Sequence, residues 1–234
     1  MNHVSIAFFI SWSTLSAFAQ QNDGTGQSNS HIYGDGFNAR AREIPFTPGE
    51  TEGSYYLFTN WSPGTITMAG GEEIRDVFLK YNFRKRTLEI KRDTTYYVLD
   101  AHDTEQFTIY DPERNEFRRF AAAKAYQLSS TPLTGALEVL FQGAVGLAAR
   151  VAPKLIEANY KGALSGGSTN NKIVKEKEYF LVKGYQLIPL PAKEKETVAV
   201  LQEHDPDIKQ FMKQERLKPK REEDLITIVE HLNQ

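Results

Sequence analysis

The chain has 234 residues, of which 40% are hydrophobic and 12% aromatic, so it can bury a core of ordinary size. Its 28 Lys and Arg residues nearly balance 30 Asp and Glu residues. The segment from Lys172 to the end holds 12 of each sign, so we expect no stretch to collect one charge and no nucleic-acid partner. Cysteine is absent, which excludes disulfides, thiol nucleophiles, thiolate metal sites and a lipid-modified cysteine.

Residues 1–19 have the features of a secretory signal peptide. An apolar core from Val4 to Leu15 is followed by Ala17-Phe18-Ala19, the small-x-small pattern that signal peptidase cleaves. The segment before this core has only the amino terminus and His3 in place of Lys or Arg, and the alternatives are a membrane anchor or a buried helix. Because the apolar run is short for a membrane span, we expect export to the periplasm or cell exterior, cleavage before Gln20 and no transmembrane span afterwards.

The mature chain divides into three regions by composition. Residues 20–42 are rich in Gln, Asn, Gly and Ser and predict a flexible leader, because so few aliphatic side chains cannot offset the entropy lost on ordering. Residues 43–191 predict an antiparallel β domain, and residues 192–234 predict short helices packed on it. The expected fold class is therefore α+β, mainly antiparallel β, with a small C-terminal helical segment.

The stretch from Tyr55 to Phe120 alternates apolar and polar residues, as is typical of strands with one buried face. Between Val77 and Arg84, for example, Phe78 and Lys80 fall on the side opposite the apolar one. Strands are expected at 65–69, 77–84, 87–91, 95–99 and 106–110. Turn residues in the links predict that consecutive strands pair antiparallel, in a meander of about seven strands.

Two further hairpins are predicted after Phe120. Strands at 137–141 and 145–151 flank a turn at Gln142-Gly143, and their apolar residues on both faces indicate central or covered strands. Residues 162–171, rich in Gly, Ser and Asn, predict an exposed loop. A second hairpin then joins 178–183 to 185–190 around Gly184.

The apolar period changes from two to about 3.6 after Lys193, which predicts helices. Asp205 and Pro206 suit the N-cap and first position of a helix that ends before Pro219. Its apolar face is Ile208, Phe211 and Met212. A last helix begins in the acidic Glu222-Glu223-Asp224, and its apolar face is Leu225, Ile228, Val229 and Leu232. Each helix has one apolar stripe, so both are expected to dock on each other or on the sheet.

Several of these segments together resemble a known group of sequences. They are YLFTNWSPGTI, DVFLKYNF, LEVLFQGAVGL, EYFLVKGYQLIPL and REEDLITIVEHLN. This succession is similar to a group of secreted or periplasmic proteins of Bacteroidota-type Gram-negative bacteria to which no activity is assigned. The resemblance covers about Tyr55 to Leu232 and implies an exported envelope or extracellular protein.

Asp100, His102, Asp103 and Glu105 lie together between two predicted strands, and their oxygen and imidazole groups could bind a divalent cation. Turns are polar for backbone reasons as well, and the spacing matches no known metal loop. We therefore predict no metal and no cofactor.

No catalytic residues are predicted. The mature chain has four histidines, and none lies in a GxSxG or HExxH context. The favoured function is a non-enzymatic binding or structural role toward an envelope or extracellular protein or polymer. The alternative is a carboxylate-dependent hydrolase acting on an envelope polymer, because paired Asp or Glu residues leave no local signature. Clustered carboxylates in a pocket would favour the hydrolase, and a flat aromatic surface would favour binding.

Trp61 is the candidate binding residue. It precedes a Ser-Pro-Gly turn, where a large aromatic side chain could serve as a binding anchor. The alternative is that Trp61 covers one end of the β domain, since Trp is largely buried on average.

Overall fold

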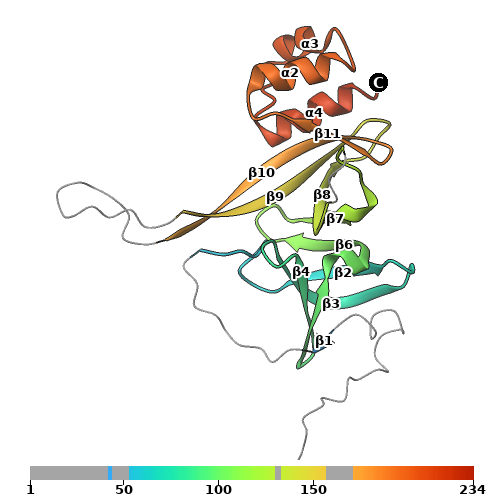
Figure 1. Cartoon of the computed structure of the whole chain (residues 1–234), viewed down its shortest axis with the longest axis vertical. Coiled ribbons are helices and arrows are strands. Elements are labelled where there is room, and N and C mark those ends of the chain that lie inside the picture. The colour runs from blue at the N-terminus through green and yellow to red at the C-terminus, as the bar shows by residue number, and fades with distance from the viewer. Residues whose placement is uncertain (1–41, 44–52, 130–132, 157–170) are drawn as a thin grey trace, which may run out of the picture.

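The computed structural model describes residues 42–43, 53–129, 133–156 and 171–234. It shows a mainly antiparallel β protein with a small helical segment at its C-terminus, which confirms the expected fold class (Figure 1). The signal peptide and nearly all of the leader and of the 162–171 loop lie outside the described residues, so those three assignments stay predictions.

Within the described residues, all strands join one sheet in the order β1-β5-β4-β3-β2-β6-β7-β8-β9-β10-β11, and each neighbouring pair is antiparallel. The strands are β1 (Arg42–Glu43), β2 (Ser62–Met68), β3 (Glu73–Asn82), β4 (Thr87–Arg92), β5 (Thr95–Asp100), β6 (Thr104–Asp111), β7 (Glu116–Ala122), β8 (Ala136–Phe141), β9 (Gly146–Ile156), β10 (Lys172–Lys183) and β11 (Gln186–Leu190).

The predicted pairing of consecutive strands holds from β2 to β5 and from β6 to β11, but it is wrong between β5 and β6. A short 3-10 helix, η1 (Ala101–Asp103), joins them, and β6 returns beside β2 instead. Ala101 is fully buried and its N–H donates to the Arg86 carbonyl at 3.0 Å, so the link closes over the curled sheet. Gly64 permits the close packing of this return, because a Cβ atom there would overlap the Thr108 carbonyl oxygen.

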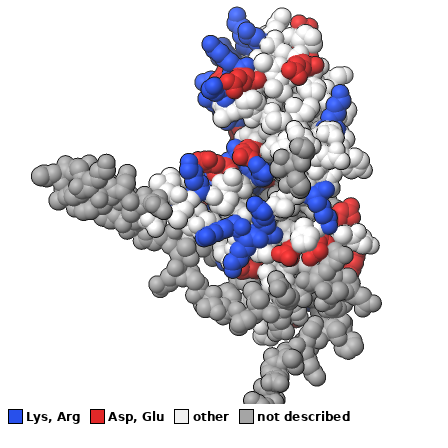
Figure 2. Space-filling view, in the orientation of Figure 1, with Lys and Arg blue, Asp and Glu red and all other residues white. Residues whose placement is uncertain are grey.

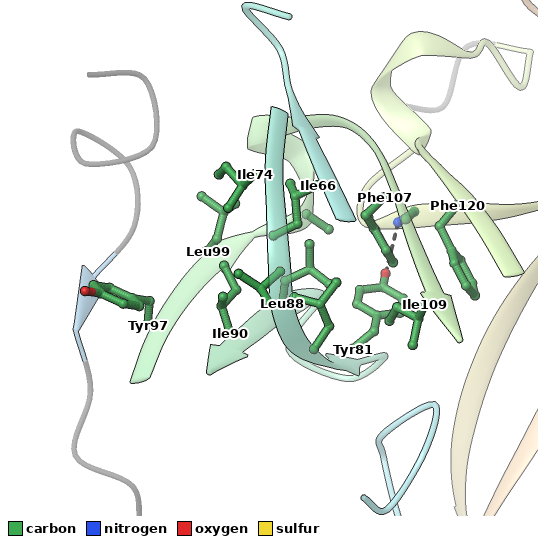
Figure 3. Close-up of a cluster of buried hydrophobic side chains, with 14 of the residues drawn as sticks. Ile66, Ile74, Tyr81, Leu88, Ile90, Tyr97, Leu99, Phe107, Ile109 and Phe120 are labelled. Atoms are coloured by element: carbon green, nitrogen blue, oxygen red, sulfur yellow. Dashed lines mark hydrogen bonds between the residues drawn. The ribbon is translucent and has the colours of Figure 1, made fainter. Parts of the chain in front are cut away.

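The first hydrophobic core fills the inside of this curled sheet (Figure 3). The inward-facing residues of β2 to β6 include several that are at most 1% exposed: Ile66, Leu79, Leu88, Ile90, Leu99, Phe107 and Ile109. Tyr81 lies at its centre, with its ring centroid 5.2 Å from that of Phe107. The Tyr81 hydroxyl accepts the Ala136 N–H at 3.0 Å, and burial raises the pKa of Tyr81 to about 12. This bond ties β8 to the first core.

The second half of the sheet carries the helices. They are α2 (Glu194–Gln202), α3 (Ile208–Gln214) and α4 (Glu222–His231), and they lie at the opposite end of the molecule from β2–β5 (Figure 1). A second core joins them to β9, β10 and β11 through Leu147, Leu181, Leu190, Leu201, Ile208, Met212, Leu225, Ile228 and Val229. The long hairpin of β9 and β10 projects sideways from the body (Figure 1).

The helix boundaries differ from the sequence prediction at one point. α4 begins in the predicted acidic turn, but α3 has Asp207 as its N-cap, so the assignment of Asp205 and Pro206 to the cap and first position is wrong. The Asp205 carboxylate instead accepts the Asp207 N–H at 2.9 Å, which forms a turn before the helix. None of the helices in the described part of the chain has the length and apolarity needed to cross a membrane.

Candidate functional site

The outer face of β2–β5 carries a group of aromatic and lysine side chains. Because side chains alternate along a strand, the residues next to buried Leu79, Ile90 and Tyr97 point away from the core. We define the aromatic–lysine surface as Trp61, Pro63, Phe78, Lys80, Lys91 and Tyr96.

The strand register brings these residues into one row. Phe78 on β3 lies opposite both Pro63 on β2 and Lys91 on β4. Lys91 in turn lies opposite Tyr96 on β5. Phe78 is 47% exposed, although a phenylalanine in a strand is usually buried. The other aromatic side chains of the surface are half-buried, so their ring faces and edges are partly open to a partner.

The lysines of this surface pack over aromatic rings. The Lys80 Nζ lies 4.3 Å from the ring centroid of Tyr56 and 5.7 Å from that of Trp61. The Lys91 Nζ lies 5.9 Å from the ring centroid of Tyr96. These distances suit cation–π attraction, which holds each ammonium group beside a ring without removing it from solvent. The result is an outer strand face on which lysines and aromatic rings alternate, with the acidic Glu89 opposite Lys80.

Trp61, the residue predicted from sequence, lies at one end of this surface. It is half-buried just before β2, and its ring centroid is 5.7 Å from that of Tyr96. The sequence reasoning missed Phe78 and Tyr96 as its neighbours. A signal for Phe78 was present, because the alternation between Val77 and Arg84 already placed it on the polar side with Lys80.

The structure brings together three of the four metal candidates. Ligand atoms of Asp100, His102 and Asp103 lie within 4.8 Å of one another, and Glu105 is outside this group. His102 is exposed, and its Nε2 lies 3.4 Å from an Asp103 carboxylate oxygen. A contact between two polar neighbours in one short link needs no metal to explain it. The absence of a metal at this cluster therefore stays a prediction.

Removing divalent cations is expected to leave the melting temperature unchanged. A ligand present at about 100 times its dissociation constant would stabilise the fold by about 2.7 kcal/mol. Thermal unfolding with EDTA, and with calcium or zinc in excess, measures this directly. His102→Ala serves as the control, because it should melt identically with and without the ions. A drop in melting temperature caused by EDTA in the unmodified protein, but not in this variant, would place a metal at the cluster.

A network of buried charges lies between the sheet and the helices. The Arg118 guanidinium donates to both carboxylate oxygens of Glu138, at 2.6 and 2.7 Å, and lies 3.4 Å from Asp111. The Glu138 side chain is 3% exposed and that of Arg118 is 11% exposed. Burial by itself would lower the pKa of Arg118, but the bidentate bond to Glu138 raises it above its ordinary value.

The network continues to the first turn of α4. The Lys177 Nζ lies 3.3 Å from Glu138 and also pairs with Glu222. Arg114 and the Tyr179 hydroxyl each donate to Glu222 at 3.1 Å. Burial would raise the pKa of Glu222, but the bond and charge of Lys177 lower it overall. The network thus connects the β6–β7 turn, β8 and β10 to the helices.

Each carboxylate of this network is engaged by cations or by backbone N–H groups. The pKa of Glu222 is lowered, opposite to the raised pKa of a general acid, and Glu138 contacts the cations Arg118 and Lys177. Asp111 is also engaged, since its carboxylate accepts the N–H groups of Glu113 and Arg114. The network therefore links α4 to the sheet.

Comparisons of the chain with protein-family models, with curated proteins and with solved structures find no match. No residue role is therefore taken from a relative, and the resemblance to secreted Bacteroidota-type proteins stays a prediction.

Proposed function

We propose that this protein is exported to the periplasm or the cell exterior, where it binds another protein or a surface polymer without catalysing a reaction. The observation that supports this role is the aromatic–lysine surface on β2–β5, with Phe78 47% exposed at its centre. The apolar segment and cleavage pattern of residues 1–19 support export.

The chemistry of the surface fits a macromolecular partner better than a small molecule. Tyr and Trp provide much of the binding energy at protein interfaces, because each buries a large area with few rotatable bonds. Lys80 and Lys91 add positive charge that can pair with acidic groups of the partner. A small-molecule site would be a concave pocket, whereas these residues lie on the open face of a sheet. A protein or an extended polymer is the better match.

Capture from a native envelope fraction tests this role. The double variant Phe78→Thr/Tyr96→Thr keeps strand-forming residues but removes two rings, so captured material should fall about tenfold or more. Phe117→Thr is the matched control, because Phe117 is 59% exposed on β7, away from the surface. Equal capture by the double variant and the unmodified protein would contradict the proposal.

Export makes a separate prediction. N-terminal sequencing of the protein from its native host should give a chain that begins at Gln20, because Ala17-Phe18-Ala19 forms the cleavage pattern. Cell fractionation should find this shortened chain outside the cytoplasm. Retention of Met1 on the native protein would remove the argument for export and leave the binding surface to be explained inside the cell.

A further inference from the structure

The helical segment carries a run of positive charge. Residues 209–221 contain six basic residues and one acidic residue, a local charge of +5 in a chain whose net charge is −2. All six basic side chains are exposed: Lys209, Lys213, Arg216, Lys218, Lys220 and Arg221. We call them the basic ridge. They correct the expectation that no stretch collects one sign, because the balanced count from Lys172 to the end averaged them with acids elsewhere.

The helix geometry places part of this charge on one side of α3. Lys209 and Lys213 lie one turn apart on α3, each directly after a buried residue, Ile208 or Met212, and both are exposed. Arg216 closes the helix with φ 57°, and the Leu217 N–H donates to the Met212 carbonyl at 2.9 Å. Lys and Arg side chains gather over the helical end of the molecule in Figure 2.

This arrangement is unfavourable for the isolated helix. Lys209 and Lys213 are like charges four residues apart, which repel. Lys209 also lies in the first turn of α3, where the helix dipole disfavours positive charge. In the described part of the chain, Arg221 is the member of the ridge with an ion pair, at 3.7 Å from Asp224. Ion pairs within the described residues therefore do not compensate the repulsion among these basic side chains, whereas a bound anion would.

A shallow hollow between α2 and α3 adjoins the ridge. Its lining is Gln202, Pro206, Asp207, Lys209, Gln210, Lys213 and Gln214, so two lysines outnumber the one carboxylate. Ammonium groups pair with carboxylates, and amide groups hydrogen-bond to hydroxyls. In the described residues, the large hydrophobic side chains that are exposed lie before the helices, so no apolar anchor for a lipid bilayer and no aromatic platform for bases accompanies the charge.

We propose that the basic ridge and this hollow bind an acidic polysaccharide, with its carboxylates on Lys209 and Lys213 and its hydroxyls on the glutamine amides. The helices lie at the opposite end of the molecule from β2–β5 (Figure 1), so this surface is distinct from the aromatic–lysine surface. Each surface can fail its own test without affecting the other.

Calorimetric titration of the mature chain with polygalacturonate tests the proposal. Binding is expected at low salt and should weaken as salt rises. Lys209→Glu/Lys213→Glu should lower the affinity about tenfold or more, because both contacts become repulsive. The matched control is Lys85→Glu/Lys124→Glu, which makes the same charge change at two exposed lysines of the β domain. It should bind almost as tightly as the unmodified protein.

Three results would overturn the proposal. An equal loss in the control variant would show that only net charge matters. Tighter binding to vesicles of anionic phospholipid, or to a single-stranded DNA homopolymer, would assign the ridge to another class of partner. Unchanged affinity of the Lys209/Lys213 variant would remove the ridge from the interaction. If that variant unfolds, Lys209→Gln/Lys213→Gln removes the charges without adding repulsion, and unchanged affinity there would equally contradict the proposal.

Discussion

Replacing Leu225 by alanine is expected to lower the free energy of unfolding by about 2 to 5 kcal/mol, the range for a truncated core leucine. Leu225 is 1% exposed and shares the second core with Ile228 and Val229, both fully buried. Removing its isopropyl group leaves a cavity between α4 and the sheet. Chemical denaturation of the variant and the unmodified protein measures the difference.

Glu230→Ala is the control for this change, because Glu230 is exposed on the same helix and alanine preserves helix propensity. It should alter stability by less than about 0.5 kcal/mol. A Leu225→Ala variant as stable as this control would mean that the helices do not share the core. If that variant also lost binding to an envelope partner, the helices would be the interaction surface.

The substitution Glu138→Gln is expected to cost about 3 to 5 kcal/mol, because it leaves the buried Arg118 charge without its main partner. Arg118 would keep Asp111, at 3.4 Å, as its remaining carboxylate. Lys177 would also lose one of its two carboxylates, which weakens the link to α4. Urea denaturation at neutral pH measures the effect.

A double variant separates the cost of an unpaired charge from the value of the pair. Replacing both partners, as in Arg118→Met/Glu138→Leu, removes the buried charge as well as its counterion, and such replacements are often neutral or stabilising. The double variant should therefore recover most of the stability lost by Glu138→Gln. A Glu138→Gln variant that unfolds like the unmodified protein would show that Arg118 is not dependent on this partner.

The strands were predictable because their signal is local. Alternation between Val77 and Arg84 fixes which side chains enter the core, and the structure buries Val77, Leu79 and Tyr81 as expected. The return of β6 beside β2 was not predictable in the same way. It depends on the burial of Ala101 and on the contact of Gly64 with β6, which join residues far apart in the chain.

The partners of Glu138 in the charge network were not predictable from the sequence either. Glu138 lies in an apolar run, and the sequence predicted a strand with both faces covered there. A buried carboxylate implies a cation nearby. The two cations come from different strands, Arg118 from β7 and Lys177 from β10, and only the pairing of the strands brings them to Glu138. The aromatic–lysine surface was half predicted: Trp61 stood out by residue type, whereas Tyr96 joined it only through the pairing of β4 with β5.

Fluorescence of Trp61 tests the proposed binding surface most directly. Trp12 and Trp61 are the two tryptophans of the chain, so Trp61 is the only one left after removal of residues 1–19. Titration of the mature chain with the partner captured from the envelope should change the Trp61 emission saturably, and Phe78→Thr/Tyr96→Thr should abolish the change. A partner that binds the mature chain while the Trp61 emission stays constant would contradict binding at this surface.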